Sequence, residues 1–197
     1  MIRGMLFAVL VGLAGAAVLH IVIILALPAF TGLDAYTRLQ GYEAPNRFVT
    51  FTSRPDDNGF SNGDPYLRVA ACTFEVGEQP VHLMASGSVP FWSFAVYDSS
   101  SNEVFSMNDR SAAGGDLDAI IASPQQLAGI RKSKPDIISQ SVLIEMPRPE
   151  GYIVLRALAP AASFEEGARA FLAEASCEPY DVAAEAQQSP VQDQSSN

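Results

Sequence analysis

The side chains best suited to chemistry are two carboxylates that follow a stretch rich in aromatic residues. Asp98 ends the aromatic run that begins near Trp92, and Asp109 follows it in the sequence. Two carboxyl groups within about 9.5 Å of each other can hydrolyse a glycosidic bond. An indole such as that of Trp92 could provide a platform for a sugar ring. One hypothesis is therefore an enzyme that acts on glycan or lipid, with Asp98 and Asp109 as its catalytic residues.

The same stretch also suits ligand binding without catalysis, or a purely structural role. The candidate binding residues are Trp92, Tyr97, Asn108 and Arg110. In a strand, Trp92 and Asp98 share one face with the two apolar residues between them, and this face is expected to meet the core. The structural alternative is that the aromatic rings pack and the polar side chains hold turns. We favour this alternative over a catalytic one.

Other catalytic chemistries lack the residues that they require. A Ser–His–Asp hydrolase needs a histidine, and the segment after residue 30 offers only His82, which alternates with apolar neighbours as on an exposed strand face. We find no cluster with metal-ligand spacing, no phosphate-binding glycine loop and no dinucleotide motif. We therefore expect neither a metal site nor a cofactor.

The elements that must position these side chains begin with a long apolar segment. Residues 5–30 contain no Asp, Glu, Lys or Arg. As a helix this segment would be roughly 39 Å long, enough to cross a hydrocarbon core of about 30 Å. The apolar region of a cleaved secretory signal, the alternative, is usually about 7–15 residues. We favour an uncleaved anchor over residues 1–30, with the lipid bilayer as its partner.

Two polar residues indicate how this anchor is oriented across the membrane and where it contacts a partner. Arg3 precedes the apolar segment, which favours a cytoplasmic N-terminus and an exported C-terminal domain. His20 lies inside the segment, where an imidazole can hydrogen-bond to a neighbouring helix. We expect His20 to contact a membrane-protein partner in preference to doing chemistry.

Charge and cysteine content limit the remaining possibilities. The formal net charge is −10, which argues against nucleic acid as a partner. Cys72 and Cys177 are the two cysteines, both after the anchor. An oxidising compartment and an even count favour a disulfide between them. The alternative is two separate buried thiols.

Apolar runs separated by turn residues predict a mainly β fold. We expect a juxtamembrane linker with a first strand or loop over 31–66, an exported β domain over 67–177 and an acidic disordered tail over 178–197. The spacing favours an antiparallel sandwich or barrel. The expected strands are 67–76, 81–85, 91–97, 104–107, 117–122 and a further pair, 137–146 and 152–158.

Two short helices are expected between these strands. One begins at Pro124 after Ser123, and a second follows a capping box formed by Ser163 and Glu166.

The central stretch resembles two groups of bacterial proteins of unknown function. One comprises short proteins with a single N-terminal span and an exported domain, and the other is the C-terminal unit of longer two-domain proteins. The resemblance covers most of residues 5–177. It implies a jelly-roll-like sandwich in the periplasm, anchored in the bacterial inner membrane, and no established activity. The matching residues are Phe91, Trp92, Ser93, Tyr97, Asp98, Asn108 and Arg110, with His20, Pro28, Asp34, Ala35, Tyr36 and Cys72 in common with the short proteins.

Three functional hypotheses follow. The first is a membrane-anchored envelope protein with a non-catalytic binding or accessory domain, which we favour. The second is a subunit of an integral membrane complex, held through the transmembrane helix. The third is an envelope glycan- or lipid-acting enzyme that uses Asp98 and Asp109.

Overall fold

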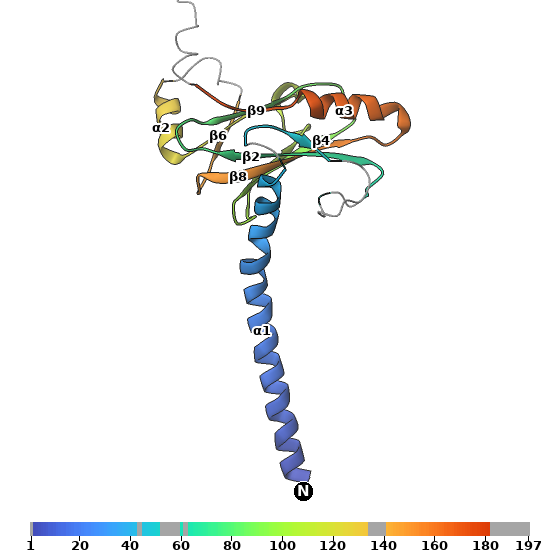
Figure 1. The fold of residues 1–197 in the computed structure, drawn as a ribbon, viewed down its shortest axis with the longest axis vertical. Coiled ribbons are helices and arrows are strands. Elements are labelled where there is room, and N and C mark those ends of the chain that lie inside the picture. Colours follow the sequence, from blue (N-terminus) through green and yellow to red (C-terminus); the bar gives the residue numbers. More distant parts are fainter. Residues whose placement is uncertain (1, 43–44, 52–59, 61–62, 134–140, 182–197) are drawn as a thin grey trace, which may run out of the picture.

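A long N-terminal helix carries a β sandwich at its end (Figure 1). The computed structural model describes residues 2–42, 45–51, 60, 63–133 and 141–181. Helix α1 spans Ile2–Gln40, and its part Ile2–Leu27 is long and apolar enough to cross a membrane, with a hydropathy of 2.7. It is the one such helix among the described residues. The N-terminal apolar helix expected from the sequence is therefore present.

The first ten residues of the expected juxtamembrane linker, 31–40, are helical. Helix α1 continues without a break to Gln40 and ends before Gly41, whose N–H donates to the carbonyl of Arg38 over 3.1 Å. Good helix formers such as Ala35, Arg38 and Leu39 sustain this extension.

Nine strands in the described part of the chain form two sheets, which confirms the mainly β sandwich. The larger sheet, sheet A, is antiparallel throughout, and sheet B is antiparallel apart from the pair β6–β7. Sheet A has the order β1 (Val49–Thr50), β2 (Leu67–Glu75), β8 (Glu150–Leu158), β4 (Trp92–Asp98) and β5 (Glu103–Asn108). Sheet B has the order β7 (Val142–Glu145), β6 (Leu117–Ala122), β3 (Val81–Ala85) and β9 (Ser176–Pro179).

The parallel pair follows from the helix that connects its strands. Helix α2 (Pro124–Ser133) lies between β6 and β7 in the chain and begins with a reciprocal capping box. The Ser123 N–H donates to Gln126 Oε1 over 2.8 Å, and the Gln126 N–H donates to Ser123 Oγ over 3.3 Å. A crossover helix returns the chain in the same direction, so β6 and β7 are parallel. The expected pairing of segment 137–146 with 152–158 is wrong, because β7 and β8 belong to different sheets.

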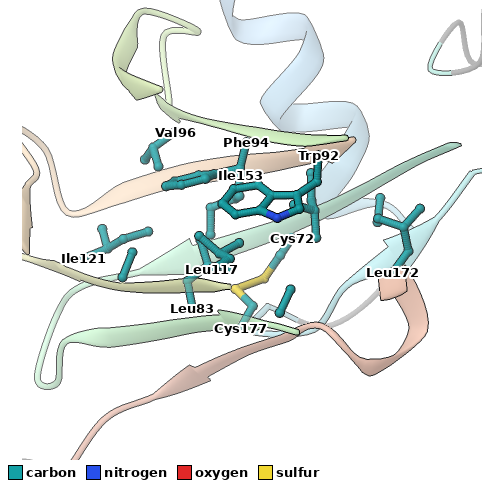
Figure 2. Packing of buried hydrophobic residues seen from close by; sticks show 14 of the residues in the cluster. Cys72, Leu83, Trp92, Phe94, Val96, Leu117, Ile121, Ile153, Leu172 and Cys177 are labelled. Atoms are coloured by element: carbon teal, nitrogen blue, oxygen red, sulfur yellow. A yellow bond between two sulfur atoms is a disulfide. The ribbon is translucent and has the colours of Figure 1, made fainter. Parts of the chain in front are cut away.

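The core lies between the sheets, and the disulfide crosses it. Trp92, Phe94 and Val96 point inward from β4, as expected for that face, and are at most 2% exposed. Cys72 of β2 is bonded to Cys177 of β9 with a Cα–Cα distance of 6.6 Å, which confirms the predicted pairing. Figure 2 shows this bond joining the two layers beneath the Trp92 ring.

The helix that follows β8 begins differently from the sequence prediction. A short 3₁₀ turn, η3 (Ala162–Phe164), leads into α3 (Glu165–Glu174), whose N-terminal cap makes no side-chain hydrogen bond. The capping box expected at Ser163 is therefore wrong, because the 3₁₀ turn satisfies the first helical amides instead.

The predicted tail also begins too early. Strand β9 extends to Pro179, and Tyr180 is buried beside α2 at 6% exposure. The rest of the predicted tail, residues 182–197, lies outside the described residues.

Candidate functional site

Trp92 belongs to the core and not to a surface. Its indole Nε1 donates to the carbonyl of Gly115 over 2.9 Å, at the end of the 3₁₀ turn η1 (Ala113–Gly115). Its ring also stacks with Phe94 and Phe171, with centroids 6.4 and 6.3 Å away. At 2% exposure the ring offers no face to a ligand. The expectation that Trp92 is a binding residue or a sugar platform is therefore wrong.

Asp98 holds the hairpin between β4 and β5. Its carboxylate accepts hydrogen bonds from the N–H groups of Ser100 and Asn102, both over 2.9 Å, and from Asn102 Nδ2. Arg148 Nε lies 3.9 Å from Asp98 Oδ2. Burial opposes the charge of this carboxyl, but the Asn102 and Ser100 hydrogen bonds outweigh it, so the pKa of Asp98 is lowered. The group is thus a buried, ionised turn anchor at 4% exposure.

The two carboxylates of the catalytic hypothesis lie at opposite ends of β4. Asp98 is paired with Gly151 at the end of the strand, whereas the Asp109 N–H donates to the carbonyl of Trp92 at its start. Six residue steps along an extended strand separate these ends by about 20 Å. This distance far exceeds the separation that paired carboxylates require. Asp98 and Asp109 therefore cannot act as the expected catalytic pair.

Asn108 and Arg110 form part of a turn at that far end. The Asn108 side-chain oxygen accepts the Arg110 N–H over 3.1 Å and lies 3.5 Å from the Ser111 hydroxyl. The Arg110 side chain is exposed. Its role in binding stays a prediction, at a site separate from Tyr97.

Tyr97 belongs to a second cluster, on the outer face of sheet A. Its ring stacks on Tyr152 of β8 with centroids 4.9 Å apart and planes at 14°. The same face receives the C-terminal end of α1, where Tyr36 is 8% and Leu39 5% exposed. We call this contact the helix–sheet junction. Its members are Tyr36, Leu39, Ala71 and Tyr152, with Ala35, Phe51, Phe60, Tyr97 and Val154 packed around them.

A cavity of about 270 Å³ lies beside the junction, between the end of α1 and sheet A. Gln40 Nε2 donates to the Tyr36 hydroxyl over 2.9 Å at this cavity. Burial, followed by the charge of Glu150, raises the pKa of Tyr36. The residues around the cavity are Tyr36, Gln40, Pro45, Thr73, Phe74, Glu75 and Glu150.

Local sequence patterns do not reveal this region, because its residues come from three distant segments. The one available signal was the spacing of Tyr36 and Leu39, which puts two large apolar side chains on one face of a helix.

Neither histidine lines the junction cavity. His20 is exposed on the apolar part of α1, and its contact with a partner stays a prediction. His82 is half-buried on β3, where Nε2 lies 2.9 Å from Asp118 Oδ1 and the ring meets Tyr180 edge-on. Within the described part of the chain, no three His, Cys, Asp or Glu side chains gather as a metal site.

Comparison with known proteins gives the fold and no activity. No protein-family model matches the chain, and no curated protein matches it. The crystal structure of the VPA0106 protein from Vibrio parahaemolyticus is similar, with a TM-score of 0.56 and 9% identity over 75% of this chain. The chain spans 35% of that protein's length. A putative uncharacterized protein from Burkholderia cenocepacia has a TM-score of 0.46 and 11% identity, covering 78% of this chain and 41% of its own. The first similarity supports the sandwich architecture alone.

Proposed function

We propose that this protein is a membrane-anchored envelope protein whose β sandwich is a non-catalytic binding or accessory domain. The observation that carries this proposal is the helix–sheet junction. Because α1 runs unbroken from its apolar part into the junction, the sandwich is held in one orientation relative to the span. A fixed orientation suits a domain that must present a surface to a neighbouring protein.

The motif residues support a structural role over a catalytic one. Trp92 is buried in the core, and Asp98 is saturated by turn hydrogen bonds. With Asp109 at the other end of β4, neither carboxylate has the partner that glycoside hydrolysis requires. These observations favour binding over an enzyme that uses Asp98 and Asp109.

We further propose the inner membrane of a bacterium as the location, with the N-terminus cytoplasmic and the sandwich periplasmic. Arg3 before the apolar segment favours this orientation. The Cys72–Cys177 bond fits an oxidising compartment. The resemblance to short, single-span bacterial proteins of unknown function supports the same location.

A second candidate function is a subunit of an integral membrane complex that is held through α1. Every described side chain between Ile2 and Leu27 is at least partly exposed, and His20 is among the exposed ones. Lipid can cover the apolar side chains, whereas an imidazole at membrane depth gains a hydrogen bond from a polar partner. His20 is thus the residue that favours this candidate.

Replacement of the span separates the two candidates. Residues 5–27 are exchanged for an unrelated apolar helix of equal length, which keeps the junction in register. Both proteins are then purified from gently solubilised membranes, and their partners are identified by mass spectrometry. An accessory domain that binds through its sandwich retains a stoichiometric partner in both proteins. A subunit held through α1 loses its partner on exchange, and His20→Leu weakens the association in the native span.

A catalytic role would give a different result. If neither protein recovers a partner, and an envelope-directed activity disappears in Asp109→Asn while the fold is retained, the binding proposal is wrong.

A further inference from the structure

Strand β5 is the longest edge strand in the described part of the chain. Within sheet A it pairs with β4 alone, and the opposite edge, β1, has only two residues. Sheet B ends in β7 and β9, of four residues each. Proteins usually protect an edge with lysine, proline, short length or a bulge. Strand β5 contains no lysine or proline, and its one register shift, at Val104, leaves Phe105 to Asn108 in regular pairing.

The backbone of Ser106 points away from β4, toward the open side of this edge. In an antiparallel pair, residues that bond to the neighbouring strand alternate with residues that do not. The Asp109 N–H donates to the carbonyl of Trp92. The bonded positions two and four residues earlier are therefore Met107 and Phe105. Ser106 lies between them, and no turn or loop in the described part of the chain uses its N–H or its carbonyl.

Two copies of this edge are complementary to each other. An antiparallel pair centred on Ser106 joins each Ser106 N–H to the carbonyl of the other copy's Ser106. The same register puts Phe105 of each copy directly opposite Met107 of the other, in a closely spaced pair without hydrogen bonds. Both side chains are only half-buried in the single chain, although they pack against the core. Contacts between a thioether and an aromatic ring are favourable, so the pairing would cover these side chains.

The ends of the paired strands also have complementary charges. Antiparallel pairing puts the Glu103 end of one strand beside the Asn108 end of the other. Arg110 follows the Asn108 end, and both Arg110 and Glu103 are exposed. The neighbouring Asp109 is half-buried, with one carboxylate oxygen removed from solvent. The more exposed charges at each end of the pair are thus of opposite sign.

The membrane anchor gives two copies the symmetry that this pairing needs. The end of α1 packs against the outer face of sheet A, and the labelled strands of that sheet run across the helix axis (Figure 1). The edges of sheet A therefore point sideways, along the membrane plane. Two copies anchored in one membrane are related by a two-fold axis along its normal, which makes facing edge strands antiparallel. This two-fold relation depends on the membrane anchoring proposed above.

We propose that the protein forms a homodimer in which β5 pairs with β5 of a second copy, centred on Ser106. Sheet A of one copy then continues into sheet A of the other. The register that pairs the two Ser106 backbones also pairs Phe105 with Met107, which favours a second copy over an unrelated strand. The contact uses only the β5 edge, so the helix–sheet junction is unchanged.

Cross-linking of the full chain in isolated membranes tests this contact directly. Ser106→Cys is oxidised with copper phenanthroline, because the Cα atoms of a hydrogen-bonded pair lie about 5.5 Å apart, within the range of a disulfide. Glu145→Cys is the matched control, since Glu145 is exposed at the end of β7, an edge of sheet B. The native Cys72–Cys177 bond is buried in both proteins. We expect a covalent dimer from Ser106→Cys alone.

Substitution by proline tests the hydrogen bonds. Ser106→Pro removes the outward N–H, and an edge strand tolerates proline where the N–H faces solvent. Ser106→Ala keeps the N–H and is the control. Dilution of the full chain in detergent micelles, followed by mass photometry, gives the dissociation midpoint, and thermal unfolding verifies the fold. The wild type and Ser106→Ala should share a midpoint, and Ser106→Pro should raise it at least about tenfold because two hydrogen bonds are lost per dimer.

Three results overturn the proposed dimer. Ser106→Cys cross-links no better than Glu145→Cys, or another protein replaces the second copy in the cross-linked product. The third is a folded Ser106→Pro with the wild-type midpoint, which indicates assembly through α1. If Ser106→Pro does not fold, the cross-link alone decides. Failure of the anchoring proposal is a separate observation, because the full chain is then absent from the membrane fraction, and cross-linking in solution still decides whether β5 pairs.

Discussion

At the scale of single residues, Asp98 shows how position decides the role of a carboxylate. A buried carboxyl normally resists ionisation, yet backbone and side-chain donors around the Ser99–Asn102 turn stabilise its charge. The turn contains no glycine, and Ser101 adopts a positive φ of 60° to close it. The carboxylate thus compensates a strained turn by satisfying the N–H groups that the hairpin leaves open.

Replacing Asp98 should destabilise the fold without affecting a distant site. We expect Asp98→Ala to lose about 2–3 kcal/mol of unfolding free energy at pH 7, because several donors lose a charged acceptor. Urea unfolding measures this loss, and Asp116→Ala, an exposed substitution, should change stability by less than about 0.5 kcal/mol.

The same carboxyl makes the stability of the fold depend on pH, and the lowered pKa gives the sign of this dependence. Its pKa is lower in the folded protein than its ordinary value of 3.8, so its stabilisation is complete above that value and is lost as the pH falls through the folded pKa. Asp98→Asn should show a smaller loss in acid than the wild type. An identical acid profile would contradict this account of the hairpin.

At the scale of elements, the C-terminal end of α1 determines how the sandwich is oriented relative to the helix. Tyr36 and Leu39 lie three residues apart and present one apolar face to Ala71 and Tyr152 of sheet A. Packing against the sheet stabilises the last turns of a helix that would otherwise fray in water.

Truncation of Leu39 should release this end of the helix. Leu39→Ala should cost about 2–5 kcal/mol at the junction, as for other buried leucines. Hydrogen exchange should then increase in residues 35–40 while the amides of β4 and β8 keep their protection. Met84→Ala removes an equally large side chain that is 45% exposed, and should leave the exchange of α1 unchanged.

The elements also show which features a sequence can and cannot reveal. Strands such as Val81–Ala85 and Leu117–Ala122 carry dense apolar patterns, and their predicted ends agree with the structure. Strand β9 was missed because its four residues include Glu178 and Pro179, which resemble a tail.

The sites were less accessible to prediction than the strands. The turn role of Asp98 depends on nearby residues and was predicted. The cavity joins Gln40, Thr73 and Glu150, whose proximity depends on long-range packing that no local pattern contains.

At the scale of the whole molecule, the disulfide is the covalent link between the two layers. Cys72 lies in the larger sheet and Cys177 in the smaller one, 105 residues apart in sequence. Closing a loop of that length restricts the unfolded chain, an effect worth about 4–5 kcal/mol in the chain-entropy model.

Loss of this bond should therefore affect the sandwich as a whole. We expect Cys72→Ala/Cys177→Ala to lower the unfolding free energy by about 4–5 kcal/mol, with the additional effect of two truncated core side chains. Chemical denaturation with and without reductant provides the comparison, because reduction of the wild type leaves the core volume unchanged. A midpoint that is insensitive to reductant would contradict this role of the bond.

Because α1 is continuous, its length also determines how the sandwich is rotated about the membrane normal. Each helical residue turns the chain by about 100° and advances it by 1.5 Å. The number of residues between the span and Tyr36 therefore sets the rotation of the sandwich about the membrane normal. It also sets the height of the sandwich above the membrane. One inserted residue would rotate the whole domain about the helix axis by about 100°. Seven inserted residues would restore nearly the original orientation and place the domain about 10 Å farther from the bilayer.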